Sequence, residues 1–274
     1  MKLNYKRTIL VGFAFLSICA FWQLYDNVIP LILKNTFHMR DDIAGVIMAL
    51  DNVLALFLLP LFGKISDGCR TKLGKRMPFI LGGTAAAVVL MNLLPIAAGA
   101  KSQGLFIALL CLLLVAMGTY RSPAVALMPD VTPKPLRSKG NAIINLMGAL
   151  GGVFTLGVTG FLVTRDAAGN EDYTRLFLAV SVLMAVAVVI LLCAIRENKL
   201  AGQVREINEK LDAESGEAVL DEKPEAGRSG FKALPPELRR SLILILVSVS
   251  LWFMGYNAVT SAFTKYVNVQ WGYD

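Results

Sequence analysis

Residues 60–80 read PLFGKISDGCRTKLGKRMPFI, a short segment with five basic side chains and one acidic side chain. Two long apolar runs flank it, Ile43–Gly63 before and Met77–Ala100 after. Each run has the length of about 20 residues that a helix needs to cross the hydrocarbon core of a bilayer. We therefore interpret the segment as a short cytoplasmic loop between two membrane-spanning helices.

The composition of the whole chain is that of a polytopic membrane protein. Hydrophobic residues occupy 55% of the 274 positions and charged residues 17%, and the mean hydropathy is +0.60, whereas a soluble domain carries more charge. We predict an all-α fold of seven membrane-spanning helices. The other five apolar runs are Thr8–Leu33, Ser102–Met128, Gly140–Thr164, Leu176–Ile195 and Ser241–Thr264.

The basic residues are distributed unevenly between the two sides of the membrane. If the N-terminus lies inside, 20 of the 27 Lys and Arg residues are on the inner side and six on the outer side. The positive-inside rule therefore predicts a multi-pass protein of the cell membrane with a cytoplasmic N-terminus. The net charge of +7 is accounted for by these loops, so we expect the lipid bilayer as a partner and no nucleic acid.

We predict three regions along the chain. Residues 1–195 form a six-helix transmembrane bundle, residues 196–240 a cytoplasmic linker, and residues 241–274 a seventh transmembrane helix. The linker mixes charges of both signs without an apolar period that could bury a core, although Val204–Leu211 is compatible with a surface helix.

Two carboxylates lie within predicted spans, where an ionisable side chain is costly and suggests function. Asp26 is seven residues from the outer end of the first span and Asp51 eight residues from the outer end of the second. At 1.5 Å per residue both lie about 11–12 Å deep. If they face each other, repulsion and desolvation favour a proton on one of them, as in a proton carrier. The alternative is that each is only hydrogen-bonded, for example by Asn27 or Asn52.

Two stretches resemble a known family of transporters. Gly63, Ser66-Asp67 and Gly74-Lys75-Arg76 resemble the signature of the loop between the second and third helices of the major facilitator superfamily. The insertion Cys69–Leu73 followed by GKRMP resembles the glycoside–pentoside–hexuronide cation symporters. The end of the fourth span, GTYRSPAVALMPDVTPKPLRSKGNA, resembles the sucrose-transporter-like branch of these symporters.

The resemblance implies a secondary active transporter that couples symport of a sugar or glycoside to a cation by alternating access. Members are expected to have twelve helices in two similar halves, and this chain supplies six plus one, so we expect a partial chain. The alternative is a truncated membrane half-domain without transport of its own. We expect no enzyme, no cofactor and no metal site, because His38 is the only histidine and neither HExxH nor a nucleophile elbow occurs.

The coupling cation is predicted from a departure from the family pattern. Sodium-coupled carriers of the melibiose type have carboxylates at the positions that correspond here to Ala55 and Leu59. Apolar side chains cannot bind sodium, so a proton carried by Asp26 or Asp51 is favoured.

The candidate substrate-binding residues are polar or aromatic groups within spans. Arg121 lies in the inner half of the fourth span, where its guanidinium either faces a cavity and binds a pair of hydroxyls or extends to the inner headgroups. Aromatic spacing on the seventh helix suggests a sugar-stacking face, although packing explains such residues equally. These residue types do not identify the sugar. The full set is Tyr25, Arg121, Asn145, Trp252, Tyr256 and Asn257, with Asn145 open to a packing role as well.

We predict a gating latch at the cytoplasmic end of the bundle. Gly63 allows another helix to approach, and Asp67 can meet the positive N-terminus of a neighbouring helix. Asp130, at the end of the fourth span, is expected to pair with Arg70 or Arg76. The members of the predicted gating latch are Gly63, Asp67, Arg70, Gly74, Arg76 and Asp130.

Overall fold

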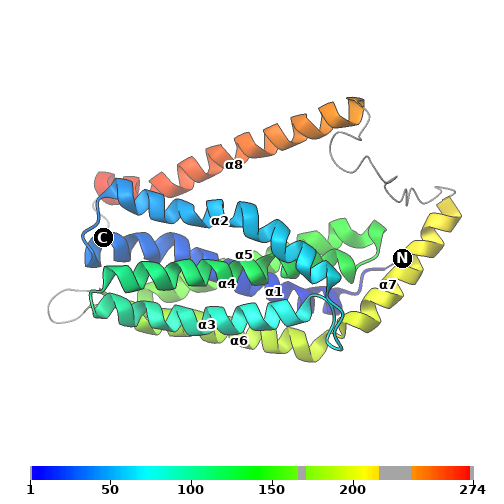
Figure 1. Ribbon diagram of the computed structural model, residues 1–274, viewed down its shortest axis with the longest axis horizontal. Coiled ribbons are helices and arrows are strands. Elements are labelled where there is room, and N and C mark those ends of the chain that lie inside the picture. Colours follow the sequence, from blue (N-terminus) through cyan, green and yellow to red (C-terminus); the bar gives the residue numbers. More distant parts are fainter. Residues whose placement is uncertain (1, 166–170, 216–235, 272–274) are drawn as a thin grey trace. The chain divides into compact units, whose positions relative to one another are not determined.

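The computed structural model of the protein describes residues 2–165, 171–215 and 236–271, and these residues are almost entirely helical (Figure 1). Seven of the described helices are long and apolar enough to cross a membrane, which confirms the predicted all-α fold with seven spans. The elements are α1 (Tyr5–Leu31), η1 (Ile32–Thr36), α2 (Asp41–Gly68), α3 (Met77–Gly99), α4 (Gln103–Asp130), η2 (Lys134–Leu136), α5 (Arg137–Leu162), β1 (Thr164–Arg165), β2 (Glu171–Asp172), α6 (Thr174–Ala194), α7 (Glu197–Ser215) and α8 (Pro236–Trp271).

The chain divides into two compact units. The first, Met1–Leu211, contains α1–α6 and most of α7, and the second, Asp212–Asp274, contains α8. The first unit includes most of α7 because this helix is hydrogen-bonded to two loops of the bundle. The helix α7 includes the segment Val204–Leu211 that is compatible with a surface helix by its sequence.

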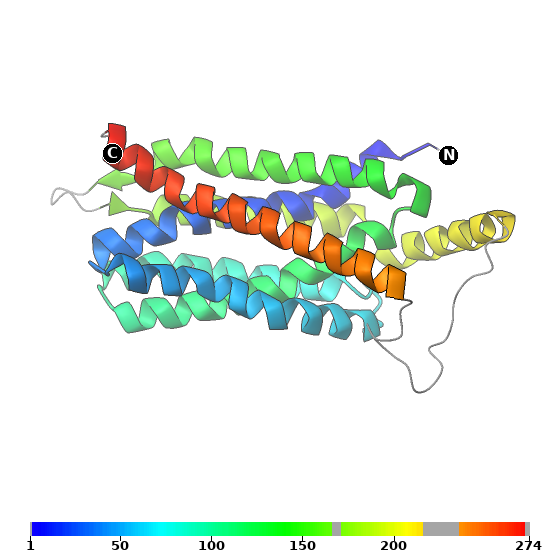
Figure 2. The same cartoon turned by 90° about the horizontal axis from the view of Figure 1, so that it is seen from above.

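The packing of the six bundle helices follows a repeat of three. Helix α1 packs against α5 and α6, α4 packs against α2 and α3, and α3 packs against α6 (Figures 1 and 2). Exchanging α1 with α4, α2 with α5 and α3 with α6 maps this set of contacts onto itself. Internal repeats of this kind are common in transporter folds, and here the repeat is visible in the packing although it is not visible as residue identity.

Small residues allow α1 and α5 to approach closely. A Cβ atom added at Gly151 of α5 would lie 2.0 Å from the carbonyl oxygen of Leu16 of α1. One turn away, the Thr155 hydroxyl donates a hydrogen bond to the Ala20 carbonyl oxygen at 3.0 Å. Close backbone approach through small residues is a typical way for membrane helices to associate, so the glycine-rich segment of α5 serves packing.

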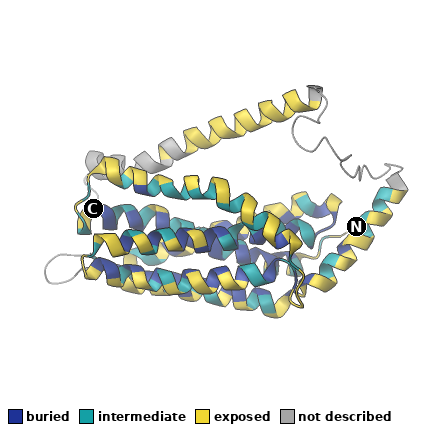
Figure 3. Cartoon of the chain, in the orientation of Figure 1, coloured by how far each residue is buried: buried dark blue, intermediate teal, exposed yellow. Residues whose placement is uncertain are grey.

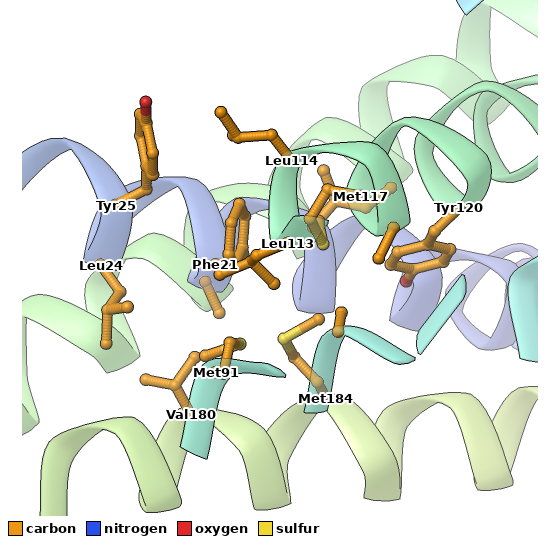
Figure 4. Close-up of a cluster of buried hydrophobic side chains, with 14 of the residues drawn as sticks. Phe21, Leu24, Tyr25, Met91, Leu113, Leu114, Met117, Tyr120, Val180 and Met184 are labelled. Carbon is orange, nitrogen blue, oxygen red and sulfur yellow. The ribbon is translucent and has the colours of Figure 1, made fainter. Parts of the chain in front are cut away.

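The apolar core of the bundle lies where α1, α3, α4 and α6 meet. In Figure 4, Phe21 and Leu24 of α1 lie near Met91 of α3 and near Val180 and Met184 of α6, and all five side chains are buried. Helix α2 contributes little to this core, because only two of its residues, Ile47 and Ser66, are buried and the others are at least partly exposed (Figure 3).

Helix α2 is held mainly by α4. The Ser122 hydroxyl of α4 donates a hydrogen bond to the carbonyl oxygen of Leu59 at 2.8 Å. A Cβ atom added at Gly118 would lie 3.1 Å from the side chain of Leu58, so the absence of a side chain there lets the two helices meet. The same stretch of α2 and α4 forms two walls of the pocket described next.

Candidate functional site

A small pocket lies between α1, α2 and α4, within the stretches that have the length and composition of membrane spans. Among the described residues, its ionisable side chains are Asp51 from α2 and Arg121 from α4, and Trp22 contributes an indole ring from α1. The remaining lining is apolar or small, consisting of Leu54, Ala55, Leu58, Leu59, Leu114 and Gly118. Sequence reasoning predicted roles for Asp51 and Arg121 but not for Trp22.

The structure brings Asp26, Asp51 and Arg121 within electrostatic range of one another. Each of these charges influences the others through space, and no hydrogen bond or ion pair joins the three side chains within the described residues. The Asn52 amide donates a hydrogen bond to Asp51 Oδ1 at 2.8 Å, as the purely structural alternative requires. The Asn27 amide, however, donates to the Gln23 carbonyl oxygen at 2.7 Å. Asp51 is therefore hydrogen-bonded to its neighbour and also belongs to a cluster of charged residues, which consists of Asp26 of α1, Asp51 of α2 and Arg121 of α4.

The Arg121 side chain reaches the same pocket as Asp51, although a straight-helix count places its Cα about 13 Å deeper. Side chains on a helix lean toward its N-terminus, so Arg121 is directed toward the Gln103 end of α4 and hence toward the level of Asp51. Its guanidinium carbon lies 5.2 Å from the centre of the Trp22 ring. In the part of the chain that the structure describes, the guanidinium makes no hydrogen bond or ion pair.

The other predicted substrate-binding residues of the bundle do not line this pocket. Tyr25 is buried, and its hydroxyl donates a hydrogen bond to the Met48 carbonyl oxygen of α2 at 3.3 Å, so it links α1 to α2. Asn145 is exposed on α5. For both residues a role in substrate binding stays a prediction.

The aromatic residues of α8 belong to the second unit. The rings of Trp252 and Tyr256 are stacked, with centroids 5.4 Å apart and an interplanar angle of 16°, and both residues are exposed. Their spacing of four residues thus places them on one side of the helix. The side chain of Asn257 lies outside the described residues.

The predicted gating latch is organised around Arg76, whose side chain is 6% exposed. Arg76 Nε donates to Asp130 Oδ2 at 3.0 Å, Nη2 pairs with Asp67, and Nη1 donates to the Ser66 hydroxyl. Lys75 Nζ adds a second ion pair with Asp130 at 3.2 Å. One guanidinium thereby joins the C-terminal ends of α2 and α4 to the start of α3.

Arg70, the alternative partner that we considered for Asp130, is exposed and makes no hydrogen bond or ion pair within the described ranges. Gly63 lies at the contact between α2 and α4, where an added Cβ would lie 3.1 Å from the Ser122 hydroxyl oxygen. Its carbonyl oxygen also accepts a hydrogen bond from Arg76 Nη1 at 3.4 Å. The geometry thus places Asp130 and Gly63 beside Arg76 and leaves Arg70 apart.

Glu197, the first residue of α7, is a buried member of this cluster that sequence reasoning missed. Its carboxylate accepts hydrogen bonds from the backbone nitrogens of Lys75, Arg76 and Met77 at 2.9–3.1 Å, and the residue is 1% exposed. The first N–H groups of a helix lack partners within it, and the positive end of the helix dipole attracts an anion. Glu197 therefore caps the start of α3.

Gly74 makes room for this carboxylate. Its φ angle is +131°, in a region that residues with a Cβ rarely adopt, and an added Cβ would lie 2.1 Å from Glu197 Oε2. Gly74 is one of the residues that resemble the family's loop signature, and in this chain the contact with Glu197 explains why a glycine stands there. Nothing in the sequence showed which distant carboxylate would cap α3.

Helix α7 also contacts two loops of the bundle. The Asn198 amide donates to the carbonyl oxygens of Thr71 and Lys72 at 2.9 and 3.1 Å. Asn208 Oδ1 accepts a hydrogen bond from the Lys134 backbone nitrogen at 3.0 Å. These bonds hold α7 against both the loop between α2 and α3 and the connection between α4 and α5.

Comparisons with known proteins agree with the resemblance seen in the sequence. The family model described as Major Facilitator Superfamily matches residues 11–274. The human protein named Proton-associated sugar transporter A is 26% identical over 188 residues, which are 63% of this chain and 25% of that protein. The chain thus aligns with about a quarter of the length of this relative.

Proposed function

The chain belongs to the major facilitator superfamily, and from this we propose that it is a symporter that moves a sugar or glycoside together with a proton by alternating access. Carriers of this kind hold the substrate near the middle of the membrane and expose it to one side at a time. We also propose that the protein resides in the cell membrane with a cytoplasmic N-terminus, because the basic residues concentrate in the loops of that side.

The observation that carries the proposal is the membrane-level pocket lined by Asp51 and Arg121, together with the electrostatic influence of both groups on Asp26. With both aspartates ionised the cluster has a net charge of −1, and one added proton makes it neutral. A neutral cluster is cheaper to enclose in a low-dielectric site than a charged one. Closure of the pocket would therefore be favoured when a proton is bound, which couples the proton to the conformational change.

A proton is favoured over sodium by the rest of the pocket lining. Sodium and other hard cations prefer several oxygen ligands, whereas the wall contributed by α2 beside Asp51 consists of Leu54, Ala55, Leu58 and Leu59. The name of the human relative supports the same choice, because that protein is called a proton-associated sugar transporter. We propose that Arg121 binds the sugar, because a planar guanidinium can donate hydrogen bonds to two hydroxyl groups at once.

We further propose that the cluster around Arg76 is a gating latch that breaks in the other conformation. It joins α2, α3 and α4 through Asp67 and Asp130, and interhelical ion pairs of this type have two discrete arrangements, made or broken. Rearrangement of α2 against α4 would also open or close the pocket, because these two helices form its walls.

The test uses the full-length protein in proteoliposomes with an imposed pH gradient. Uptake of radiolabelled glucose, galactose, sucrose and maltose is measured for the unmodified protein and for Asp26→Asn and Asp51→Asn. We expect each substitution to abolish accumulation against the sugar gradient and to preserve exchange of internal for external sugar. Asp42→Asn is the matched control, since Asp42 is exposed at the start of α2 and pairs with Arg40. If both pocket variants still accumulate sugar with an unchanged pH profile, the two aspartates do not couple transport to protons.

A further inference from the structure

Trp22 lines the same pocket as Asp51 and Arg121. The Arg121 guanidinium carbon is 5.2 Å from the centre of its ring, within the distance of about 6 Å at which a cation is attracted to the face of an indole. Among the ring types, Trp gives the strongest attraction of this kind. The contact joins α1 to α4 at the level of the proposed proton-binding aspartates.

The indole ring is the group that the structure places directly against the Arg121 cation. Within the described residues the guanidinium makes no hydrogen bond and no ion pair, and its attraction to Asp26 and Asp51 acts at longer range. Apart from Asp51, the other residues that line the pocket are Leu, Ala and Gly, which cannot compensate a charge. A contact with an aromatic face strengthens when water is excluded, so this ring stabilises Arg121 most when the pocket is closed.

We propose that Trp22 is a positioning residue for Arg121, which its indole face holds so that the guanidinium N–H groups remain free for the hydroxyl oxygens of the transported sugar. Attraction through a ring face uses the charge of the guanidinium without consuming its five N–H donors. A carboxylate bonded to the same group would consume two of them. The identity of the ligand rests on the proposed function, whereas the contact between Trp22 and Arg121 does not.

The core fixes the orientation of the Trp22 ring. The ring is edge-on to Phe21 at 5.2 Å with an angle of 75°, and to Tyr25 at 5.4 Å with an angle of 81°. Phe21 and Tyr25 are buried (Figure 4), and the Tyr25 hydroxyl is bonded to the Met48 carbonyl oxygen. A binding group works best when its supports are themselves held by packing, and Trp22 has such supports in the preceding residue and in a residue one turn later.

A second feature of Trp22 also points to a ligand. Its indole Nε1 is buried and has no hydrogen-bond partner among the described residues. A buried donor without a partner costs free energy, and an oxygen atom of a bound sugar or a water that enters with it would remove that cost. The same side chain would then position Arg121 with its face and contribute a donor with its edge.

The transport experiment compares Trp22→Phe and Trp22→Leu, each with Arg121 present and with Arg121→Gln. Uptake of radiolabelled glucose and sucrose by proteoliposomes gives KM and the maximal rate. Loss of a desolvated cation–π contact corresponds to about a 5- to 30-fold change in affinity, so we expect Trp22→Leu to raise KM by this factor and Trp22→Phe by less. In the Arg121→Gln background, Trp22→Leu should add little. An equal effect in both backgrounds, or an unchanged KM, contradicts the proposal.

A fluorescence experiment tests the contact without any transport. In a variant with Trp252→Phe and Trp271→Phe, Trp22 is the only remaining tryptophan of the three in the chain. We expect Arg121→Gln to shift its emission maximum and the matched control Arg70→Gln to leave it unchanged. If the unmodified protein transports neither sugar, the proposed function fails, while this shift still decides whether Trp22 holds Arg121. An emission maximum that is the same with and without Arg121 overturns the proposal.

Discussion

The carboxylate of Glu197 accepts two hydrogen bonds from the backbone nitrogen of Arg76, at 3.0 and 3.1 Å. The side chain of the same arginine pairs with Asp67 of α2 and Asp130 of α4. One residue is thus held through its backbone by α7 and through its guanidinium by two spans. Any movement of α7 would therefore reach the proposed gating latch directly.

Removal of the Glu197 carboxylate should destabilise the bundle. Glu197→Ala leaves three backbone N–H groups at the start of α3 without their acceptor in a buried site, and we expect a loss on the order of 3 kcal/mol in the free energy of unfolding. Glu197→Gln keeps one acceptor oxygen and should cost less. The apparent unfolding temperature in detergent measures the loss of stability in both variants. Glu206→Ala, an exposed position on α7, is the control, and equal unfolding temperatures for the two alanine variants would refute the capping role.

A side chain at Gly74 should destabilise the same site for a different reason. The φ angle of +131° is unfavourable for alanine, and the new Cβ would collide with the Glu197 carboxylate. We expect Gly74→Ala to cost about 1–3 kcal/mol, measured by the same unfolding assay. Gly82→Ala is the matched control, because an added Cβ at Gly82 meets nothing within 4 Å and alanine favours a helix interior. Similar stability of the two variants would mean that the loop can relax around the new methyl group.

The two acidic partners of Arg76 should differ in importance. The side chain of Asp130 is 22% exposed and contacts both Arg76 and Lys75, whereas that of Asp67 is 60% exposed. Ion pairs weaken with exposure to solvent, so Asp130→Asn should lower the unfolding temperature more than Asp67→Asn. If the gating latch operates as proposed, both variants should also lower the maximal rate of sugar uptake. Transport kinetics that are unaltered in both would remove the latch from the mechanism.

The proposed orientation in the membrane can be tested by labelling. In a background with the four native cysteines replaced by alanine, Gln203→Cys on α7 should be protected from an impermeant thiol reagent in intact cells. Gln103→Cys, at the start of α4, should be labelled because we place that end of the helix outside. Both positions are exposed in the structure, so burial does not explain a difference. Ready labelling at position 203 with protection at position 103 would reverse the orientation.

The spans were predictable from the sequence because the bilayer sets their length and composition independently of the rest of the fold. Counting residues along antiparallel helices predicts that Asp26 and Asp51 lie at a similar depth, and their role as a pair that binds a proton stays a prediction. Counting did not show that the Arg121 side chain would line the same pocket as Asp51, because a residue count follows the backbone and takes no account of the length and direction of a side chain.

The contacts of Glu197 and Trp22 were not predictable in the same way. Glu197 meets residues more than 100 positions away, and no local pattern specifies which distant carboxylate caps a given helix. Trp22 lies in an apolar run where packing is the ordinary explanation of an aromatic side chain. Its role emerged only when the structure placed Arg121 over the ring.

The most direct test of proton-coupled symport is to measure proton movement when sugar is added. Proteoliposomes that contain a pH-sensitive dye receive external sugar, with no imposed pH gradient and no sodium. We predict that transported sugar acidifies the interior, that a protonophore abolishes this signal, and that Asp26→Asn and Asp51→Asn lack it. Sugar uptake that leaves the internal pH unchanged, or that requires sodium, would contradict the proposal.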